Sequence, residues 1–291
     1  MLHFDKEIIL NCDALPSPNS LKVSLETDDF IIAVKGSSLP SAPLKGGQRS
    51  VMDILADEKP YLKSVQGRSG NEFGLLHRID NDTRGLLLIA KTQAFYDYIQ
   101  ENQISGSFVK TYTAYSENFP GADSYKKMTF PFEVKSRFRS FGKNGAAVKP
   151  VFEDSGRASQ KKAGKREYST TILSVSPFLE NPACYKIEAA ITSGFRHQVR
   201  AHLASLNSPV LGDRIYGADA AVAENSGLDA DGKLNGNSNG ISNGGTDKAE
   251  MLFFASGLCF SGLNGERCFY RLSPALLDSD AERTFLTSLT R

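Results

Sequence analysis

Residues 77–92 read HRIDNDTRGLLLIAKT, and this stretch is the most informative part of the sequence. Arg78 and Asp80 stand two residues apart, a polar turn follows, and the apolar run at 86–90 is typical of a strand buried on both faces. In an extended segment such side chains point the same way, so we expect Arg78 to hold the Asp80 carboxylate ionised and oriented. A fixed carboxylate can act as a nucleophile or general base, and it can equally be a structural ion pair.

A second segment, at 194–203, reads GFRHQVRAHL. The pattern predicts a short helix at 197–206, and the N–H groups and dipole at a helix start favour a phosphate. His197 and Arg200 near this start are candidates for substrate binding, although Arg200 could equally brace the helix. For Gln198 and His202 we expect only a bracing polar network.

Composition sets broad limits on the protein. A length of 291 residues allows one large domain or two modest ones, and 40% of the residues are hydrophobic. No apolar run approaches the length that spans a bilayer, and the first residues show no secretory signal. The four cysteines are scattered without a C-x-x-C pair, so we expect reduced thiols, no zinc site and a cytoplasmic location.

Charge is unevenly distributed along the chain. The net charge is only +1, yet residues 126–167 hold 12 Lys and Arg against 4 Asp and Glu. Such asymmetry suits a polyanion contacted on one side, and it equally suits a solvated charged insertion.

The periodicity predicts an α+β protein with a mostly antiparallel, mixed β-sheet flanked by helices. The predicted strands cover 30–35, 86–90, 108–115, 168–175, 183–191, 253–260 and 267–272. The predicted helices cover 51–56, 92–102 with Thr92 as N-cap, 197–206, and 279–289, where Ser279 and Glu282 have capping-box spacing. Residues 218–250 are rich in Gly, Asn and Ser and lack apolar surface, which indicates a flexible insertion.

The first segment resembles the H-R-L-D-x-x-T-S-G-L-L-L signature of the RluA-type pseudouridine synthases, whose catalytic aspartate falls on Asp80. Residues 29–35, DFIIAVK, resemble the opening strand of that family. Residues 110–114, KTYTA, resemble its K-x-Y-x-A segment and put the active-site tyrosine at Tyr112. Residues 194–217 resemble its G-R-T-H-Q-I-R-V-H-L and P-V-L-G-D-x-x-Y-G motifs.

This resemblance implies a pseudouridine synthase fold and an isomerase that converts specific uridines of tRNA or rRNA to pseudouridine. The bond between N1 and the ribose is broken and the base is rejoined through C5, without a cofactor and after the base has left the stack. Asp80 would attack or stabilise the ribose C1′, and Tyr112 would stack on the detached uracil. His77, Arg78 and Thr83 of the first motif would help to bind or flip the substrate.

The resemblance also suggests a domain organisation. We expect an N-terminal extension at 1–27, too short for the S4-type RNA-binding domain of many relatives, and a catalytic domain at 28–291. A basic insertion at about 120–166 would form an RNA approach surface, which adds salt-dependent affinity. The residues assigned to this surface are Lys161, Lys162, Lys165 and Arg166.

The chain departs from the family pattern at three positions. Phe195 stands where the family has an arginine that pairs with the catalytic aspartate, and we expect Arg196 to take over this pairing. Gly36 replaces the usual proline after the lysine. Arg84 replaces the serine of the signature and adds a charge to which the sequence assigns no role.

Two other functions stay open at this stage. The first is a catalytically impaired RNA-binding or RNA-folding module of the same fold, suggested by the altered arginine motif. The second is a metal-dependent hydrolase that uses His77, Asp80, His197 and His202, although these residues lack the close spacing of such sites. Our leading interpretation has RNA as partner, no metal, no membrane contact and a monomeric state.

Overall fold

A computed structural model describes residues 2–44, 46–119, 128–142, 145–178, 181–217 and 250–289. The strands are β1 (Lys6–Leu10), β2 (Leu21–Glu26), β3 (Phe30–Lys35), β4 (Arg84–Ala90), β5 (Val109–Ser116), β6 (Phe132–Phe141), β7 (Ala147–Val151), β8 (Tyr168–Phe178), β9 (Asn181–Ile191), β10 (Phe253–Ser261) and β11 (Arg267–Leu272). The helices are α1 (Val51–Glu58), a 3₁₀ turn η1 (Pro60–Ser64), α2 (Gln93–Ser105), α3 (Arg157–Lys162), α4 (Gln198–Ser205) and α6 (Pro274–Leu289).

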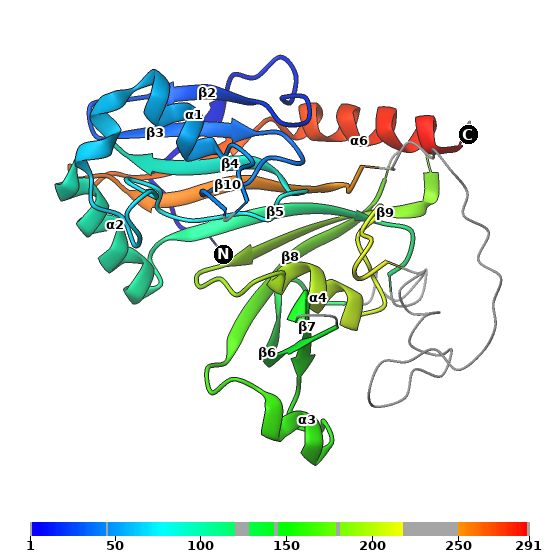
Figure 1. The fold of residues 1–291 in the computed structure, drawn as a ribbon. Helices are drawn as coiled ribbons and strands as arrows, with labels where there is room; N and C mark the ends of the chain where they lie inside the picture. The colour runs from blue at the N-terminus through cyan, green and yellow to red at the C-terminus, as the bar shows by residue number, and fades with distance from the viewer. Residues whose placement is uncertain are drawn as a thin grey trace.

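One large sheet organises the chain (Figure 1). Its strand order is β2-β3-β4-β10-β5-β9-β8-β6-β7, with β11 paired to β10 and β1 paired to β11. The β1–β11 and β4–β10 pairs are parallel, and the other pairs are antiparallel. The predicted α+β class with a mostly antiparallel, mixed sheet is therefore confirmed.

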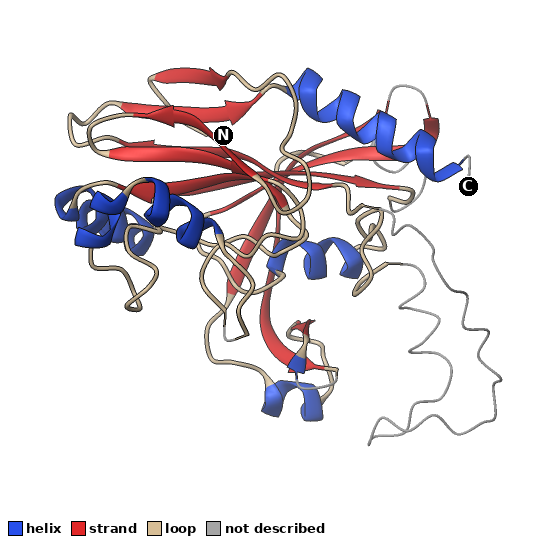
Figure 2. Cartoon of the chain, turned by 45° about the horizontal axis from the view of Figure 1, so that its top comes forward, coloured by secondary structure: helices blue, strands red, loops and turns tan. Residues whose placement is uncertain are grey.

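The sheet is buried on both faces, as β3 illustrates. Ile31 and Ala33 point into a core that also holds apolar side chains of α1 and α4. Phe30 and Ile32 point the opposite way, into a core shared with α2 and α6. This alternation explains why residues 30–34 of β3 and 86–90 of β4 are apolar throughout instead of at every second position. Figure 2 shows helices on both sides of the sheet.

Local capping sets the helix ends. The Thr92 side chain accepts a hydrogen bond from Phe95 N, which confirms Thr92 as the N-cap of α2. The predicted start of the last helix at Ser279 is wrong, because α6 begins at Pro274. Proline suits a first helical turn, since its fixed φ matches the helix and its missing N–H has no partner there.

Two regions that the sequence left outside the catalytic sheet contribute strands to it. The expected extension at 1–27 contains β1 and β2, which pair with β11 and β3, so a boundary at residue 28 would divide a continuous sheet. The basic insertion contains β6, β7 and α3, which project away from the body of the sheet (Figure 1). Of the flexible insertion predicted at 218–250, only Glu250 lies within the described residues.

No helix in these described ranges combines the length and the apolar character needed to cross a bilayer.

Candidate active site

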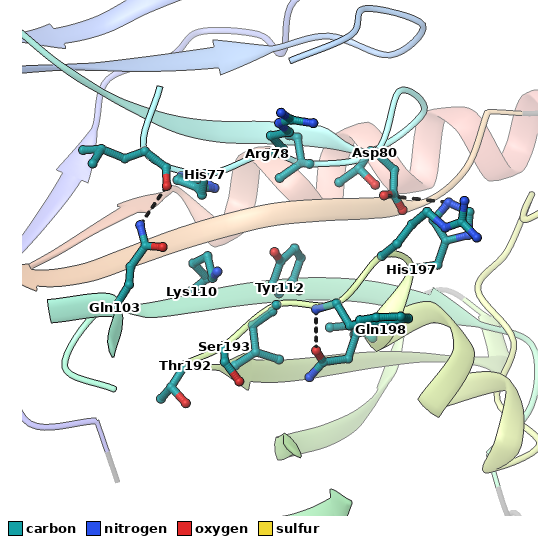
Figure 3. A pocket seen from close by; sticks show the side chains of 18 of the residues that line it. His77, Arg78, Asp80, Gln103, Lys110, Tyr112, Thr192, Ser193, His197 and Gln198 are labelled. Atoms are coloured by element: carbon teal, nitrogen blue, oxygen red, sulfur yellow. Dashed lines mark hydrogen bonds and ion pairs between the residues drawn. The ribbon is translucent and has the colours of Figure 1, made fainter. Parts of the chain in front are cut away.

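A cavity of about 780 Å³ opens on the sheet face that carries α1 and α4. Six parts of the chain line it: the loop before β4, the end of α2, the β5 strand, Arg166 before β8, the segment from the end of β9 into α4, and Phe253 of β10. Figure 3 shows Asp80 and His197 at one end of the cavity, Tyr112 in the middle, and Lys110 with His77 towards the other end. The two sequence motifs singled out above therefore meet across one cavity.

Asp80 lies in the turn that leads into β4, where its carbonyl accepts a hydrogen bond from Thr83 N at 3.1 Å. Arg200 Nη1 donates to Asp80 Oδ2 at 2.8 Å, and His197 Nε2 lies 3.9 Å from Oδ1. The Asp80 side chain keeps 25% of its surface exposed. One carboxylate oxygen is thus fixed by an arginine, while the group as a whole stays accessible from the cavity.

Arg200 is itself held by a second carboxylate, Asp213. Its Nε and Nη2 donate to the two oxygens of Asp213 at 2.7 and 2.8 Å, and the Asp213 side chain has no exposed surface. Burial opposes the charge on both groups, but their mutual contact outweighs it, raising the pKa of Arg200 and lowering that of Asp213. A permanently charged arginine is thereby fixed against Asp80.

The predicted pairing of Asp80 with Arg196 is wrong. Arg196 Nη2 donates to the carbonyl oxygens of Gly145 and Ala147, at the start of β7, and Arg200 pairs with Asp80 instead. Because Arg200 makes this ion pair, Phe195 does not leave the aspartate unpaired. The Phe195 ring stacks on Phe138 instead, with 5.0 Å between centroids. Arg200 lies inside the helix, where its side chain reaches both carboxylates, whereas Arg196 precedes the helix and points to the hairpin.

Arg78 also differs from the prediction. Its guanidinium forms an ion pair with Glu72, not with Asp80, and its side chain is 58% exposed. The segment 77–80 is a loop and not a regular strand, so the alternation of side chains assumed for it does not apply. Arg78 still lines the cavity, at its rim.

Tyr112 projects from β5 towards the centre of the cavity (Figure 3). Its ring stacks on Phe253 with 5.2 Å between centroids and an interplanar angle of 9°. Burial, and then the nearby charge of Asp80, raise the pKa of the Tyr112 phenol far above its usual range. Tyr112 is therefore a neutral phenol at ordinary pH, and its chemistry is that of an aromatic surface with an O–H group.

Three further candidates line the same cavity. His77 Nε2 accepts a hydrogen bond from Leu88 N at 3.1 Å, and burial lowers the pKa of its ring well below the usual range. Thr83 is 1% exposed, and its hydroxyl has no partner among the described residues. His197 Nδ1 lies 3.2 Å from the hydroxyl of Tyr216, and burial lowers the pKa of the His197 ring.

The bracing roles expected for Gln198 and His202 are confirmed. Gln198 Oε1 accepts from Phe195 N, and its Nε2 donates to Ser169 O on β8. His202 is fully buried, with its ring nitrogens 2.8 Å from the hydroxyls of Ser136 and Thr170. These bonds tie α4 to β8 and β6 and so fix the helix that presents Arg200.

The residues assigned to the RNA approach surface are all exposed, but only one reaches the cavity. Lys161 and Lys162 lie on α3, at the far end of the projecting hairpin (Figure 1). Lys165 follows α3, and Arg166 lines the cavity with its guanidinium 5.1 Å from the Tyr168 ring. The basic segment therefore extends from the cavity mouth outwards.

Sequence reasoning missed two contributors to the site. Asp213 stands in the segment PVLGDRIYG at 209–217, to which the resemblance assigned no role, and no signal in the sequence pairs it with Arg200. Lys110 stands in KTYTA two residues before Tyr112, on the same face of β5, and the period of a strand could have placed it in the cavity. Within the described ranges, no group of three or more His, Cys, Asp or Glu is arranged to hold a metal ion.

The fold and the joined motifs define the class of protein. A family model described as RNA pseudouridylate synthase matches residues 29–205, and the chain belongs to this family, in its RluA-type branch. The Zymomonas mobilis ribosomal large subunit pseudouridine synthase D is 31% identical over 69% of this chain and 57% of its own length. An uncharacterized RNA pseudouridine synthase, YhcT of Bacillus subtilis, is 23% identical over 74% of this chain and 64% of its own length.

The mitochondrial pseudouridylate synthase RPUSD4 of Rattus norvegicus is 24% identical over 68% of this chain and 52% of its own length. The chain thus spans about three fifths of the length of the curated relatives it matches. The solved structure of human RNA pseudouridylate synthase domain containing 1 aligns with a TM-score of 0.56 at 16% identity, covering 90% of this chain and 88% of that one. This likeness confirms the pseudouridine synthase fold.

Proposed function

We propose that this protein is an RNA pseudouridine synthase, an isomerase that converts uridine in RNA to pseudouridine with Asp80 as nucleophile. The observation that carries the proposal is the Asp80 carboxylate, which Arg200 fixes at 2.8 Å while it remains open to a cavity that also presents Tyr112. Membership of the family indicates the reaction, and the cavity offers a place for one nucleotide that has left the base stack of the RNA.

In the proposed reaction, an Asp80 oxygen attacks the ribose C1′, and the C1′–N1 bond breaks with its electron pair left on N1. The uracil turns within the cavity, its C5 forms a bond to C1′, and the Asp80 oxygen departs. The proton on C5 is lost to water while N1 gains one, so the product is an isomer and no redox partner takes part. Tyr112 supports the detached uracil with its ring.

The alternative, a catalytically impaired RNA-binding module, rested on the altered arginine motif. Arg200 supplies the ion pair that Phe195 cannot make, so this reason no longer favours it. Several relatives are named as ribosomal large subunit pseudouridine synthases, which makes rRNA the first substrate to test and tRNA the second.

The experiment is tritium release from RNA labelled at uridine C5, with rRNA and tRNA as separate substrates and Asp80→Asn as the matched variant. We expect release by the parent protein from one RNA pool, and none by Asp80→Asn. Binding of RNA without release by the parent would reject the isomerase. Equal release by Asp80→Asn would reject Asp80 as nucleophile.

A further inference from the structure

The end of the cavity away from Asp80 holds a buried cation whose partner is missing among the described residues. Lys110 on β5 is 8% exposed, and no carboxylate of the described chain lies within ion-pair distance of its Nζ. The ammonium lies 5.7 Å from the centre of the Phe108 ring, a contact that offsets little of the cost of burying a charge. Lysines are seldom buried without a partner unless the site receives one.

The groups around Lys110 are donors too. Burial, and then the charge of Arg68, lower the pKa of the Lys110 ammonium to about 8. The His77 ring contacts the same Phe108 ring, with 5.6 Å between centroids. Its Nε2 accepts from Leu88 N, so its Nδ1 carries the proton, and this buried N–H has no acceptor among the described residues.

Arg68, an exposed residue that lines the cavity and whose charge acts on Lys110, is held in place by α2. Its Nη2 donates to Gln100 Oε1 at 3.2 Å and to Gln103 Oε1 at 3.1 Å. Gln103 is fixed in turn, because its Nε2 donates to Leu76 O at 2.7 Å (Figure 3). These two hydrogen bonds restrict the conformations of the exposed Arg68 side chain and so pre-organise its guanidinium for binding.

We propose that this end of the cavity is a phosphate subsite, in which Lys110 and Arg68 bind the RNA backbone phosphate next to the target uridine. The identity of the ligand as RNA rests on the proposed function; the anionic character of the subsite does not. We call Lys110, Arg68 and His77 together the Lys110 subsite.

Three observations favour a phosphate over the uracil base as the occupant. The subsite offers two cations and a further N–H, whereas the edge of a uracil carries both donors and acceptors and no full charge. The described lining of the whole cavity has Asp80 as its one carboxylate, and this lies at the other end. Lys110 also lies two residues along β5 from Tyr112, roughly 7 Å away, which leaves room for the base beside Tyr112.

Access to Lys110 Nζ depends on a glycine. A Cβ added at Gly194 would lie 3.4 Å from Nζ, so the backbone there passes close to the ammonium without covering it by a side chain. An incoming phosphate oxygen can therefore approach from the cavity.

The test measures binding without turnover, in an Asp80→Asn background, with a fluorescein-labelled oligouridylate as probe and potassium chloride varied. We expect Lys110→Gln to weaken binding about tenfold, as loss of one charge-assisted contact does. The slope of log Kd against log salt should fall by about 0.7, the value for one phosphate contact on a single strand. Lys110→Arg should keep the parent slope, and Arg68→Gln, an exposed change that leaves the core intact, should lower it as Lys110→Gln does.

The matched control is Lys59→Gln, which removes a lysine that pairs with Glu26 outside the cavity. This variant should bind as the background protein does. Unchanged affinity and slope in both Lys110→Gln and Arg68→Gln would overturn the subsite, and so would weaker binding with the parent slope, which would mean that Lys110 acts by packing. Loss of slope together with no tritium release by the parent enzyme would keep the subsite and reject the proposed isomerase.

Discussion

Two buried arginine–aspartate clusters among the described residues differ in what they leave exposed. In the cavity, Arg200 is shared between Asp213, which is fully buried, and Asp80, whose side chain is 25% exposed. At the start of β4, Arg84 Nη1 lies 2.6 Å from Asp280 Oδ2 of α6, and both side chains are about 95% buried. Both clusters pair an arginine with aspartates, and they differ in whether one carboxylate stays accessible. Only the accessible carboxylate, Asp80, could react with a substrate.

The second cluster also accounts for the charge that the sequence could not assign. Arg84 points to α6 and not to Asp80, and its guanidinium lies 4.6 Å from the centre of the Phe254 ring. It also lies 3.3 Å from Glu250. This cluster joins β4 to the C-terminal helix, and the cavity cluster joins the Asp80 turn to α4.

The largest effect should come from breaking the cavity cluster. Arg200→Gln removes the cation that fixes Asp80 and leaves Asp213 buried without its partner. We expect tritium release to fall about 1,000-fold, equivalent to about 4 kcal/mol, with a loss of thermal stability as well. Steady-state release and thermal unfolding measure the two effects, and turnover within tenfold of the parent would contradict the role given to Arg200.

Breaking the other cluster should cost stability alone. In Arg84→Met, the buried Asp280 loses its buried cation and keeps only its ion pair with the largely exposed Arg283. We expect the free energy of unfolding to fall by about 2 kcal/mol while kcat stays within about twofold. Urea denaturation measures the first quantity. The double variant Arg84→Met/Asp280→Leu is the control, and it should recover most of the lost stability because an apolar pair of similar size needs no counter-charge. A large loss of kcat in a folded Arg84→Met protein would place Arg84 in the site.

His202, whose hydrogen bonds fix α4 to β6 and β8, should make the free energy of unfolding depend on pH. Burial lowers the pKa of His202 to about 4, from an ordinary value of about 6.5. The neutral, buried His202 therefore stabilises the folded protein fully above pH 6.5. This stabilisation is lost as the pH falls towards 4, because His202 binds a proton more tightly in the unfolded chain than in the folded protein. Between pH 7 and pH 5 we expect a loss of about 2 kcal/mol that is absent in His202→Gln, measured as the difference between their urea curves. An equal loss of unfolding free energy between pH 7 and pH 5 in the parent protein and in His202→Gln would reject this account.

The sequence predicted the core strands well, because residues 30–34 of β3 and 86–90 of β4 are all apolar. It also predicted the start of α2, because Thr92 is a strong helix cap. It missed β1, which lies at the sheet edge with a largely exposed surface and so lacks the apolar signal of a buried strand. The predicted helix at 92–102 ends too early, because α2 continues to Ser105, and Ile104 in its last turn is 87% exposed and lines the cavity. Periodicity reports the buried face of a helix, and it does not show where that helix runs past the core.

The site was predictable in composition but not in pairing. The motifs located Asp80, Tyr112 and the arginine-rich segment, and the fold brings all three to one cavity. Which arginine meets Asp80 depends on where α4 begins, and the helix start shifts the direction of every side chain after it. Arg200 lies on the first turn of α4, whereas Arg196 lies before His197, whose φ of 55° turns the chain.

The smallest change in turnover should come from Arg196→Ala, which distinguishes Arg196 from Arg200. Arg196→Ala removes contacts to the Gly145 and Ala147 carbonyl oxygens, which water can replace at this exposed edge. We expect kcat for tritium release to change less than about threefold, against the loss expected for Arg200→Gln in the same assay. A collapse of kcat in folded Arg196→Ala, with RNA still bound, would mean that the segment rearranges on binding and that the pairing seen in the free protein is not the one used with substrate.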